Sequence, residues 1–172
     1  GNCDGNAVTE HQFGRGRVIW GKTAREMFLA NGVRPDFDFI LQDPGTKPAS
    51  TSRPSVVLDY IHRRDGEWDI YFVCNQTDRV VLADVTFRIN GRTPELWDAT
   101  TGRIRALPIY TQTDSQTTVP LRFEPYQSWF VLFPKNTNRI AAKTNHNFPD
   151  FQTVHELTGP WTVRFDPQWG GP

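Results

Sequence analysis

The sequence predicts an all-β chain: an antiparallel β-sandwich, jelly-roll-like or immunoglobulin-like, with a short strand–helix unit at its N-terminus. Three observations predict this fold. Apolar and polar residues alternate with period two through most of residues 54–135, as they do in half-buried strands. Aromatic residues make up 13% of the chain and fit a pleated surface. Glycine and proline, 13 of each, supply turns, which recur at the roughly 8–12-residue spacing of a sandwich or barrel.

The first forty residues differ from the rest of the chain. Residues 17–20 predict a short strand and residues 23–30 a short helix, which Asn31 and Gly32 end in the manner of a C-terminal cap. Residues 43–54 are rich in Pro, Ser and Thr and predict a loop. We therefore assign residues 1–40 to the end of a preceding domain and expect the sandwich to span residues 54–135.

Within the sandwich, the sequence predicts which side chains face inward. The Asp65–Gly66 pair between two alternating segments predicts a hairpin turn, and we expect Trp68, Ile70, Phe72 and Cys74 to share the buried face of the strand that follows. Residues 128–133 are apolar on both faces, which predicts a central strand. The predicted core contains Trp68, Phe72, Val85, Phe87, Leu121, Val131 and Phe133.

The last part of the chain predicts a linker and one more strand. Residues 136–153 are polar and rich in Asn, and we expect them to link two domains. Residues 154–172 predict the first strand of a following sugar-binding-like domain, with Trp161, Val163 and Phe165 on one face. Since such a strand would leave an apolar stripe and an open edge, we expect it to dock onto the main sheet or onto a second copy of the chain.

Composition excludes several classes of function. Lysine plus arginine equals aspartate plus glutamate, at 19 each, which argues against a nucleic-acid partner. No apolar run approaches the ~20 residues of a membrane-spanning helix, so we expect no membrane partner. No Cys-x-x-Cys pair or His cluster is present, so we expect no metal and no cofactor. A disulfide between Cys3 and Cys74 stays open, but two free thiols are the preferred interpretation.

Some residues could carry carbohydrate chemistry. Glycoside hydrolysis needs two carboxyl groups at defined separation, and a sequence cannot give that separation for its candidates. We therefore assign no catalytic residue. His62 and Arg63 could present an imidazole and a guanidinium to an anion or to sugar hydroxyls. Alternatively, Arg63 pairs with a strand carboxylate such as Asp69 while His62 packs half-buried. Trp97, beside Asp98 at a strand end, is the best candidate for an exposed sugar-stacking ring. The acidic candidates are Asp59, Asp69, Glu95, Asp98 and Glu124.

An ordered set of motifs is similar to one enzyme family. The segment Gly14–Gly21, GRGRVIWG, resembles the G-K-G-R-V-x-W-G segment of large multi-domain bacterial glycoside hydrolases of the α-L-rhamnosidase type. Pro35–Phe37 matches their P-D-F motif. Ile61–Asn75 resembles I-H-R-x-x-G-x-x-D-I-Y-F-V-x-N, and Phe87–Gly102 resembles F-R-x-x-G-R-x-P-E-L-W-D-x-x-T-G. The strand at residues 128–133 and the segment at residues 159–172 match as well.

The resemblance implies an internal segment of such an enzyme, with the catalytic carboxylates on a barrel domain upstream. We expect a non-catalytic accessory module that braces or lines the catalytic domain of a periplasmic or secreted bacterial enzyme. Its partners would be the other domains of the parent enzyme and a glycan, contacted by His62, Arg63, Trp97 and Asp98. Two alternatives stay open. Coplanar exposed aromatics on one face would favour an independent carbohydrate-binding module, and an acid pair in a cleft would favour a complete small hydrolase.

Overall fold

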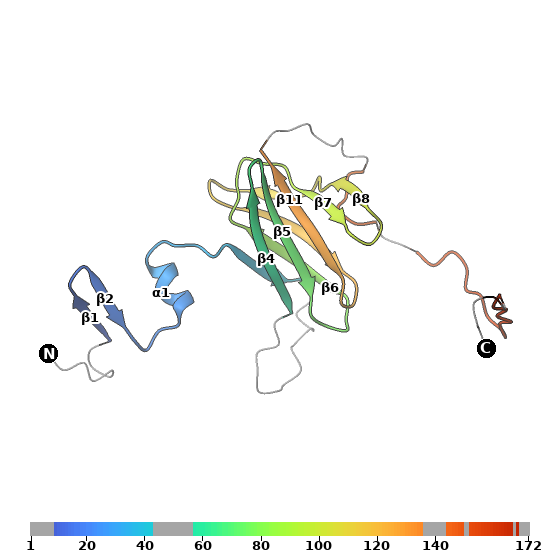
Figure 1. Ribbon diagram of the computed structural model, residues 1–172, viewed down its shortest axis with the longest axis horizontal. Coiled ribbons are helices and arrows are strands. Elements are labelled where there is room, and N and C mark those ends of the chain that lie inside the picture. Colours follow the sequence, from blue (N-terminus) through green and yellow to red (C-terminus); the bar gives the residue numbers. More distant parts are fainter. Residues whose placement is uncertain (1–8, 43–56, 136–143, 150–151, 167, 169–172) are drawn as a thin grey trace.

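The computed structural model describes residues 9–42, 57–135, 144–149, 152–166 and 168. Its body is an antiparallel β-sandwich, as the sequence predicts, built from a four-stranded and a five-stranded sheet (Figure 1). In spatial order, the four-stranded sheet contains β3 (Phe37–Leu41), β6 (Val81–Phe87), β10 (Thr117–Phe123) and β9 (Thr111–Gln112). The five-stranded sheet contains β4 (Leu58–Asp65), β5 (Trp68–Asn75), β11 (Ser128–Pro134), β7 (Glu95–Asp98) and β8 (Arg103–Ala106).

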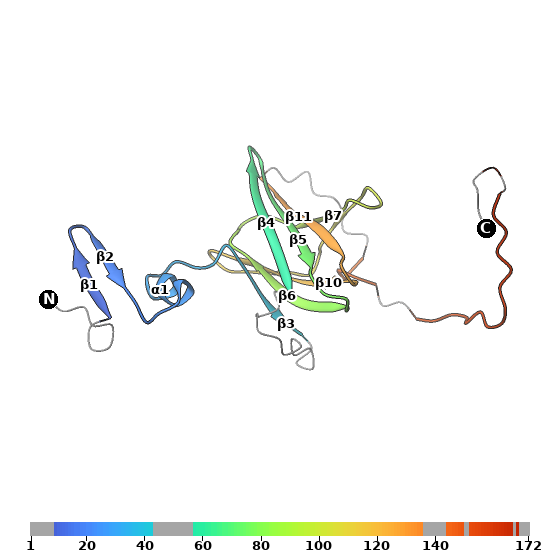
Figure 2. The same cartoon turned by 60° about the horizontal axis from the view of Figure 1, so that its bottom comes forward.

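A small unit precedes the sandwich. It contains the strand and the helix that the sequence predicts. It contains β1 (Glu10–Phe13), which pairs with β2 (Gly16–Ile19), and the helix α1 (Ala24–Ala30). The helix begins with a capping box, in which Thr23 and Glu26 satisfy each other's backbone N–H groups. No residue of α1 is buried. Figure 2 shows the unit beside the sandwich rather than on it, and no described helix is long and apolar enough to cross a membrane.

The sandwich begins earlier than the sequence analysis placed it. β3 pairs with β6 along its whole length, from Phe37 opposite Phe87 to Leu41 opposite Ala83, and Phe37 is buried in the core. Residues 37–40 therefore belong to the sandwich and not to a preceding domain. The pairing joins segments more than forty residues apart, so local patterning could not reveal it. The predicted loop at residues 43–54 lies outside the described residues.

The predicted core is correct for five of seven side chains and wrong for Trp68 and Phe72. The burial of β5 alternates so that Asp69, Tyr71, Val73 and Asn75 face inward. Trp68, Ile70, Phe72 and Cys74 lie on the outer face of the five-stranded sheet. The phase was misassigned because the outward set is the more apolar of the two. The buried apolar residues include Tyr71, Val73, Val85, Phe87, Leu96, Leu107, Val119, Leu121, Phe123, Val131 and Phe133.

Residues 136–143 of the predicted linker lie outside the described residues, but the described parts of the chain after β11 differ from the predicted linker and strand. Residues 144–149 pack on the sandwich, where the buried Asn147 donates to the carbonyls of Ile109 (2.7 Å) and Pro120 (3.0 Å). Residues 152–166 contain no strand, and Trp161 is 68% exposed. Docking of this segment onto the main sheet is therefore not observed. The thiol of Cys74 is free, whereas Cys3 lies outside the described residues.

Candidate functional site

A cluster of charged side chains forms where the chain enters the sandwich, beside the edge strand β4. Asp36 immediately precedes β3, His62 lies on β4, and Asp69 lies on β5 with its side chain facing inward. His62 stands between the two carboxylates: Nδ1 is 2.9 Å from Asp36 Oδ2, and Nε2 is 3.0 Å from Asp69 Oδ1. Both ring nitrogens can donate at once only when the imidazole carries both protons. The imidazole thus bridges the two carboxylates.

Asp69 is almost fully buried and is surrounded by donors. Arg64 Nε donates to Oδ1 at 2.9 Å, and Arg92 Nη1 donates to Oδ2 at 2.5 Å. Burial by itself would raise the pKa of Asp69, but the hydrogen bonds from Arg64 and His62 and the charges of Arg64 and Arg92 outweigh it and lower the pKa. Asp69 is therefore a fixed negative charge that holds β4, β5 and the residues before β7 together.

Asp36 is more accessible and links the same cluster to the surface. It accepts hydrogen bonds from the hydroxyl of Tyr71 at 3.2 Å and from Arg88 at 3.4 Å. Burial and the adjacent Asp36 carboxylate raise the pKa of Tyr71, so its hydroxyl remains a neutral donor. The Tyr71 ring also stacks on His62, with centroids 4.0 Å apart and planes 11° apart. Stacking and two hydrogen bonds together fix the imidazole in one orientation.

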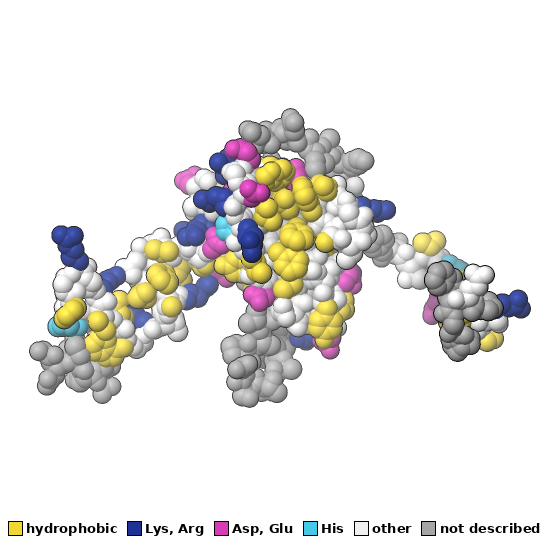
Figure 3. Space-filling view, viewed as in Figure 1, with side chains coloured by type: hydrophobic (Ala, Val, Ile, Leu, Met, Phe, Trp, Pro, Cys, Tyr) yellow, Lys and Arg dark blue, Asp and Glu magenta, His cyan; other side chains and the backbone are white. Residues whose placement is uncertain are grey.

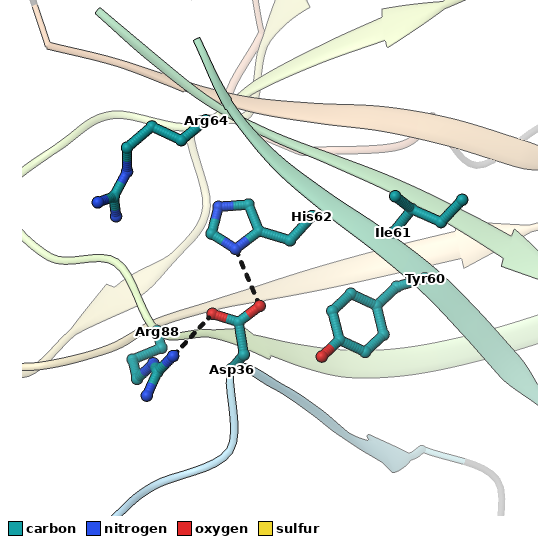
Figure 4. A pocket seen from close by; sticks show the side chains of 6 residues that line it. All are labelled: Asp36, Tyr60, Ile61, His62, Arg64 and Arg88. Atoms are coloured by element: carbon teal, nitrogen blue, oxygen red, sulfur yellow. Dashed lines mark hydrogen bonds and ion pairs between the residues drawn. The ribbon is translucent and has the colours of Figure 1, made fainter. Parts of the chain in front are cut away.

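The cluster opens into a pocket of about 740 Å³ (Figure 4). The half-exposed guanidinium of Arg88 and the more exposed one of Arg64 point donors toward solvent. Burial and the Asp36 charge raise the pKa of Tyr60, which leaves its hydroxyl neutral as well. Such donors and acceptors suit a polyhydroxylated or anionic group. The lining residues are Asp36, Tyr60, Ile61, His62, Arg64 and Arg88.

The cluster does not have the properties of a glycosidase acid pair. A general acid in such a pair has a raised pKa, whereas that of Asp69 is lowered and its two oxygens are already occupied by three partners. Glu95 is buried and accepts from Trp97 Nε1 at 3.2 Å. Within the described ranges, no group of His, Cys, Asp and Glu side chains could hold a metal ion. The geometry of this cluster therefore supports binding or bracing.

The structure separates the four residues that the sequence suggested as one carbohydrate-binding set. His62 lies in the pocket, half-buried as one of the two interpretations had it. Arg63 points to the outer face of the same strand, beside Ile70 and Phe72. The predicted ion pair of Asp69 with Arg63 is therefore wrong: Arg64, one residue further, makes it. The period of two places Arg64, and not Arg63, on the face of His62.

Trp97 and Asp98 lie on β7, three strands away from β4 in the sheet. Trp97 is half-buried and packs edge-on against Trp68, with centroids 5.7 Å apart. Asp98 caps the turn before β8, where it accepts from the backbone N–H of Thr100 at 2.9 Å and from the Thr101 hydroxyl at 2.7 Å. The side-chain hydrogen bonds of Thr100 and Thr101 lower the pKa of Asp98 to about 2. Asp98 thus stabilises a turn.

Sequence reasoning missed three members of the cluster: Asp36, Arg88 and Arg92. Each occurs within one of the motifs that carry the family resemblance, in Pro35–Phe37 and in Phe87–Gly102. Their positions in those motifs were the available signal. Spacing alone could not find them, because they lie 26 to 30 residues from His62 in the sequence and join the cluster through Asp36 and Asp69.

The fold and the cluster define a β-sandwich module whose buried charges are paired with one another. The matched sequence family is described as alpha-L-rhamnosidase, glycoside hydrolase family 106, and the match spans residues 2–112. Because that is more than half of the sequence, the chain belongs to the family 106 α-L-rhamnosidases.

Two proteins are similar to parts of this chain. A curated protein from Formosa agariphila, named “Putative beta-glucuronidase”, is 32% identical over 106 residues, which are 58% of this chain and 9% of that protein. The solved structure of a rhamnosidase from Novosphingobium sp. PP1Y matches with a TM-score of 0.63 and 30% identity, covering 81% of this chain and 12% of that one. The chain therefore spans about a tenth of the length of the relatives it matches.

Proposed function

We propose that this chain is a non-catalytic accessory module of a larger α-L-rhamnosidase-type enzyme, in which it braces the catalytic domain and lines part of its cleft. The observation that carries the proposal is the state of the charge cluster. Asp69 is committed to His62, Arg64 and Arg92, so it positions side chains and is not available to transfer a proton. The parent's catalytic carboxylates would lie outside these residues.

The contribution to the cleft would come from the pocket beside β4. Arg88 and Asp36 present a donor and an acceptor at its surface. Hydrogen bonds with His62 and Tyr71 fix the position of the Asp36 carboxylate. A planar guanidinium beside a carboxylate can bind sugar hydroxyls in a fixed orientation. The expected role is therefore substrate positioning, with Arg88 as the principal contact and His62 as a positioning residue.

An independent carbohydrate-binding module is the second candidate. It is favoured by four aromatic side chains on the outer face of the five-stranded sheet, namely Trp68, Phe72, Trp97 and Phe130. Their geometry argues against it: Phe72 and Phe130 are inclined by 52°, and Trp68 and Trp97 by 69°. Rings at such angles do not form the flat platform on which a run of sugar rings could stack.

Hydrolysis assays of the 172-residue chain and of the complete enzyme test the proposal. Aryl α-L-rhamnosides and aryl β-glucuronides are the substrates, the second because of the name of the Formosa relative. We expect turnover by the complete enzyme only, and a reduced kcat/KM when Arg88→Ala or His62→Ala is introduced into it. Turnover by the isolated chain would overturn the accessory role. Unchanged kinetics in both variants would leave bracing and remove the contribution to the cleft.

The cellular location of the parent enzyme is a separate proposal. We propose that the parent enzyme is periplasmic or secreted, because polymeric glycans are degraded outside the bacterial cytoplasm. Cell fractionation followed by immunodetection of the sandwich would test this. Recovery of the enzyme in the cytoplasmic fraction alone would contradict it.

A further inference from the structure

A continuous apolar row crosses the outer face of the five-stranded sheet. Directly paired residues of antiparallel strands project to the same face. Ile61 is opposite Phe72, Phe72 opposite Phe130, Phe130 opposite Trp97, and Trp97 opposite Ile104. We name these five residues the outer ladder. The row includes one residue from each of the five strands, so it extends across the full width of the sheet.

The two ends of the outer ladder are exposed to solvent and accessible to a partner surface. Ile61 is 59% exposed and Ile104 is 45% exposed, at the two edges of the sheet. Figure 3 shows the hydrophobic side chains gathered over β5 and β11, with charged groups beside them. A shallow depression of about 250 Å³ lies in this face, lined by Ile61, Arg63, Ile70, Phe72 and Phe130. Contiguous apolar surface of this kind is uncommon on a monomer and marks an interaction site.

No described helix or strand covers the outer ladder. The described strands belong to this sheet, to the opposite sheet or to the small N-terminal unit, and α1 lies with that unit, away from this face (Figure 1). Antiparallel sheets commonly carry polar residues on a face that meets water. The apolar row therefore indicates a face that is buried against something outside the described part of the chain.

The chemistry of the face favours a protein surface over a sugar. Aliphatic side chains stand at both ends of the row, and its rings are tilted against one another. Ligand sites place a few convergent polar groups among apolar ones. Here, however, Glu95, two residues before Trp97 on β7, is buried and accepts its hydrogen bond from Trp97 within the sheet. Such a surface resembles the apolar core of a protein–protein interface.

We infer that the outer ladder is the docking surface for another domain of the same polypeptide, which covers it with apolar side chains. The inference rests on the proposed function, since it needs a larger parent enzyme. The matched region is 12% of the Novosphingobium rhamnosidase chain, so such a parent supplies far more surface than this module. Covalent linkage also gives a neighbouring domain a millimolar-scale effective concentration, which favours it over a second copy.

Two matched double variants test the inference. Ile61→Lys with Ile104→Lys places charges at the two exposed ends of the outer ladder. Ile40→Lys with Leu82→Lys is the control, because both residues are exposed on the outer face of the opposite sheet, at 73% and 40%. Each pair is made in the isolated chain and in the complete enzyme, and thermal unfolding is followed by calorimetry.

Burying two lysines against an apolar partner without counter-charges is unfavourable. We therefore expect the outer-ladder variant to leave the Tm of the isolated chain unchanged, and to lower that of the complete enzyme by roughly 2–4 °C or more. The control should change neither. Equal effects of the two variants on the complete enzyme would overturn the inference.

Two other outcomes would assign a different occupant and also overturn the inference. An isolated chain that is dimeric by light scattering and becomes monomeric in the outer-ladder variant would identify a second copy. If a gel containing a rhamnose-rich polysaccharide retards the isolated chain but not its outer-ladder variant, the occupant would be a glycan. Turnover of aryl rhamnosides by the isolated chain would overturn the proposed function alone, and would leave the unfolding comparison to decide the docking surface.

Discussion

The two faces of β5 differ in polarity, and the more polar face is the buried one. The inward face carries Asp69, Tyr71, Val73 and Asn75, whereas the outward face carries Trp68, Ile70, Phe72 and Cys74. Judged by hydrophobicity alone, the outward set would be the core. The sandwich nevertheless buries the set with two strongly polar members.

Hydrogen bonding explains how the inward face tolerates its polar groups. Asn75 donates to the carbonyls of Arg79 (2.7 Å) and Glu124 (2.9 Å) and accepts from the backbone N–H of Thr77 (2.9 Å). Among the described residues, no buried side-chain nitrogen or oxygen lacks a partner. A buried polar group with its bonds made is compatible with a core. The apolar outward face, in contrast, can be buried by a partner surface on another domain.

The largest expected difference in unfolding free energy is between substitutions of Phe133 and Phe130, which lie on opposite faces of β11. Phe133 is completely buried on the inward face, so Phe133→Ala should cost about 4 kcal/mol of unfolding free energy through lost burial and a cavity. Phe130 lies in the outer ladder, and Phe130→Ala should cost about 1–2 kcal/mol in the isolated chain. Urea unfolding of both variants measures the difference. Equal costs would mean that the outer face is already covered within the chain.

The next effect concerns the buried charge. Asp69→Asn should cost about 3 kcal/mol at pH 7, because it leaves Arg64 and Arg92 facing a neutral amide. Folding lowers the pKa of Asp69, so its carboxylate contributes fully to the free energy of unfolding above the pKa of the unfolded chain. That stabilisation is lost as the pH falls through the lower pKa of the folded state. The difference between wild type and variant should therefore shrink below about pH 4.

Chemical denaturation at a series of pH values measures this dependence. Asp59→Asn is the matched control, since Asp59 is exposed on β4, and its variant should stay within about 0.5 kcal/mol of wild type. A constant cost of Asp69→Asn from pH 7 to pH 3 would show that the carboxylate's charge does not stabilise the fold.

A smaller effect tests the polar satisfaction of the inward face. Asn75→Ala should cost about 2 kcal/mol, because the carbonyls of Arg79 and Glu124 and the N–H of Thr77 lose their partner together. Cys74→Ala, one residue earlier on the outward face, should change the unfolding free energy by less than about 0.5 kcal/mol. Similar costs for the two variants would remove the contrast between the faces.

Sequence reasoning reached the architecture because alternation and turn residues are local signals. The hairpin at Asp65–Gly66 and the helix at residues 24–30 follow from such signals and are confirmed. The phase of β5 was not accessible, because both faces are apolar enough and only the partners of Asp69 and Asn75 decide between them. The place of β3 was not accessible either, since its partner β6 is distant in sequence.

The candidate site was predictable only in part, for a similar reason. His62 was recognised as a residue that could present an imidazole. Its partners Asp36 and Asp69 come from two other elements, and Arg63 was chosen where the strand period favours Arg64. Trp97 and Asp98 were grouped with His62 because they end a strand, and strand order alone places them on the far side of the sheet.

The smallest effect on stability distinguishes bracing from substrate positioning. Arg88 is half-exposed and its Nη2 is 3.4 Å from Asp36 Oδ1. Exposed ion pairs contribute about 0–1 kcal/mol, so Arg88→Ala should barely change the unfolding free energy of the isolated chain. In the complete enzyme, loss of a donor that orients a sugar should lower kcat/KM by about tenfold, equivalent to ~1.4 kcal/mol.

Arg88→Lys makes the same measurement more specific. A lysine keeps the charge but loses the planar two-donor geometry, so a positioning role predicts an intermediate kcat/KM, whereas a purely electrostatic role predicts full recovery. Arg103→Ala, at an exposed position on β8, controls for the loss of one surface charge. If Arg88→Ala lowers stability as much as Asn75→Ala and leaves the kinetics unchanged, the pocket belongs with the inward face as a structural element, and the outer ladder is left as the surface, among the described residues, through which this module acts.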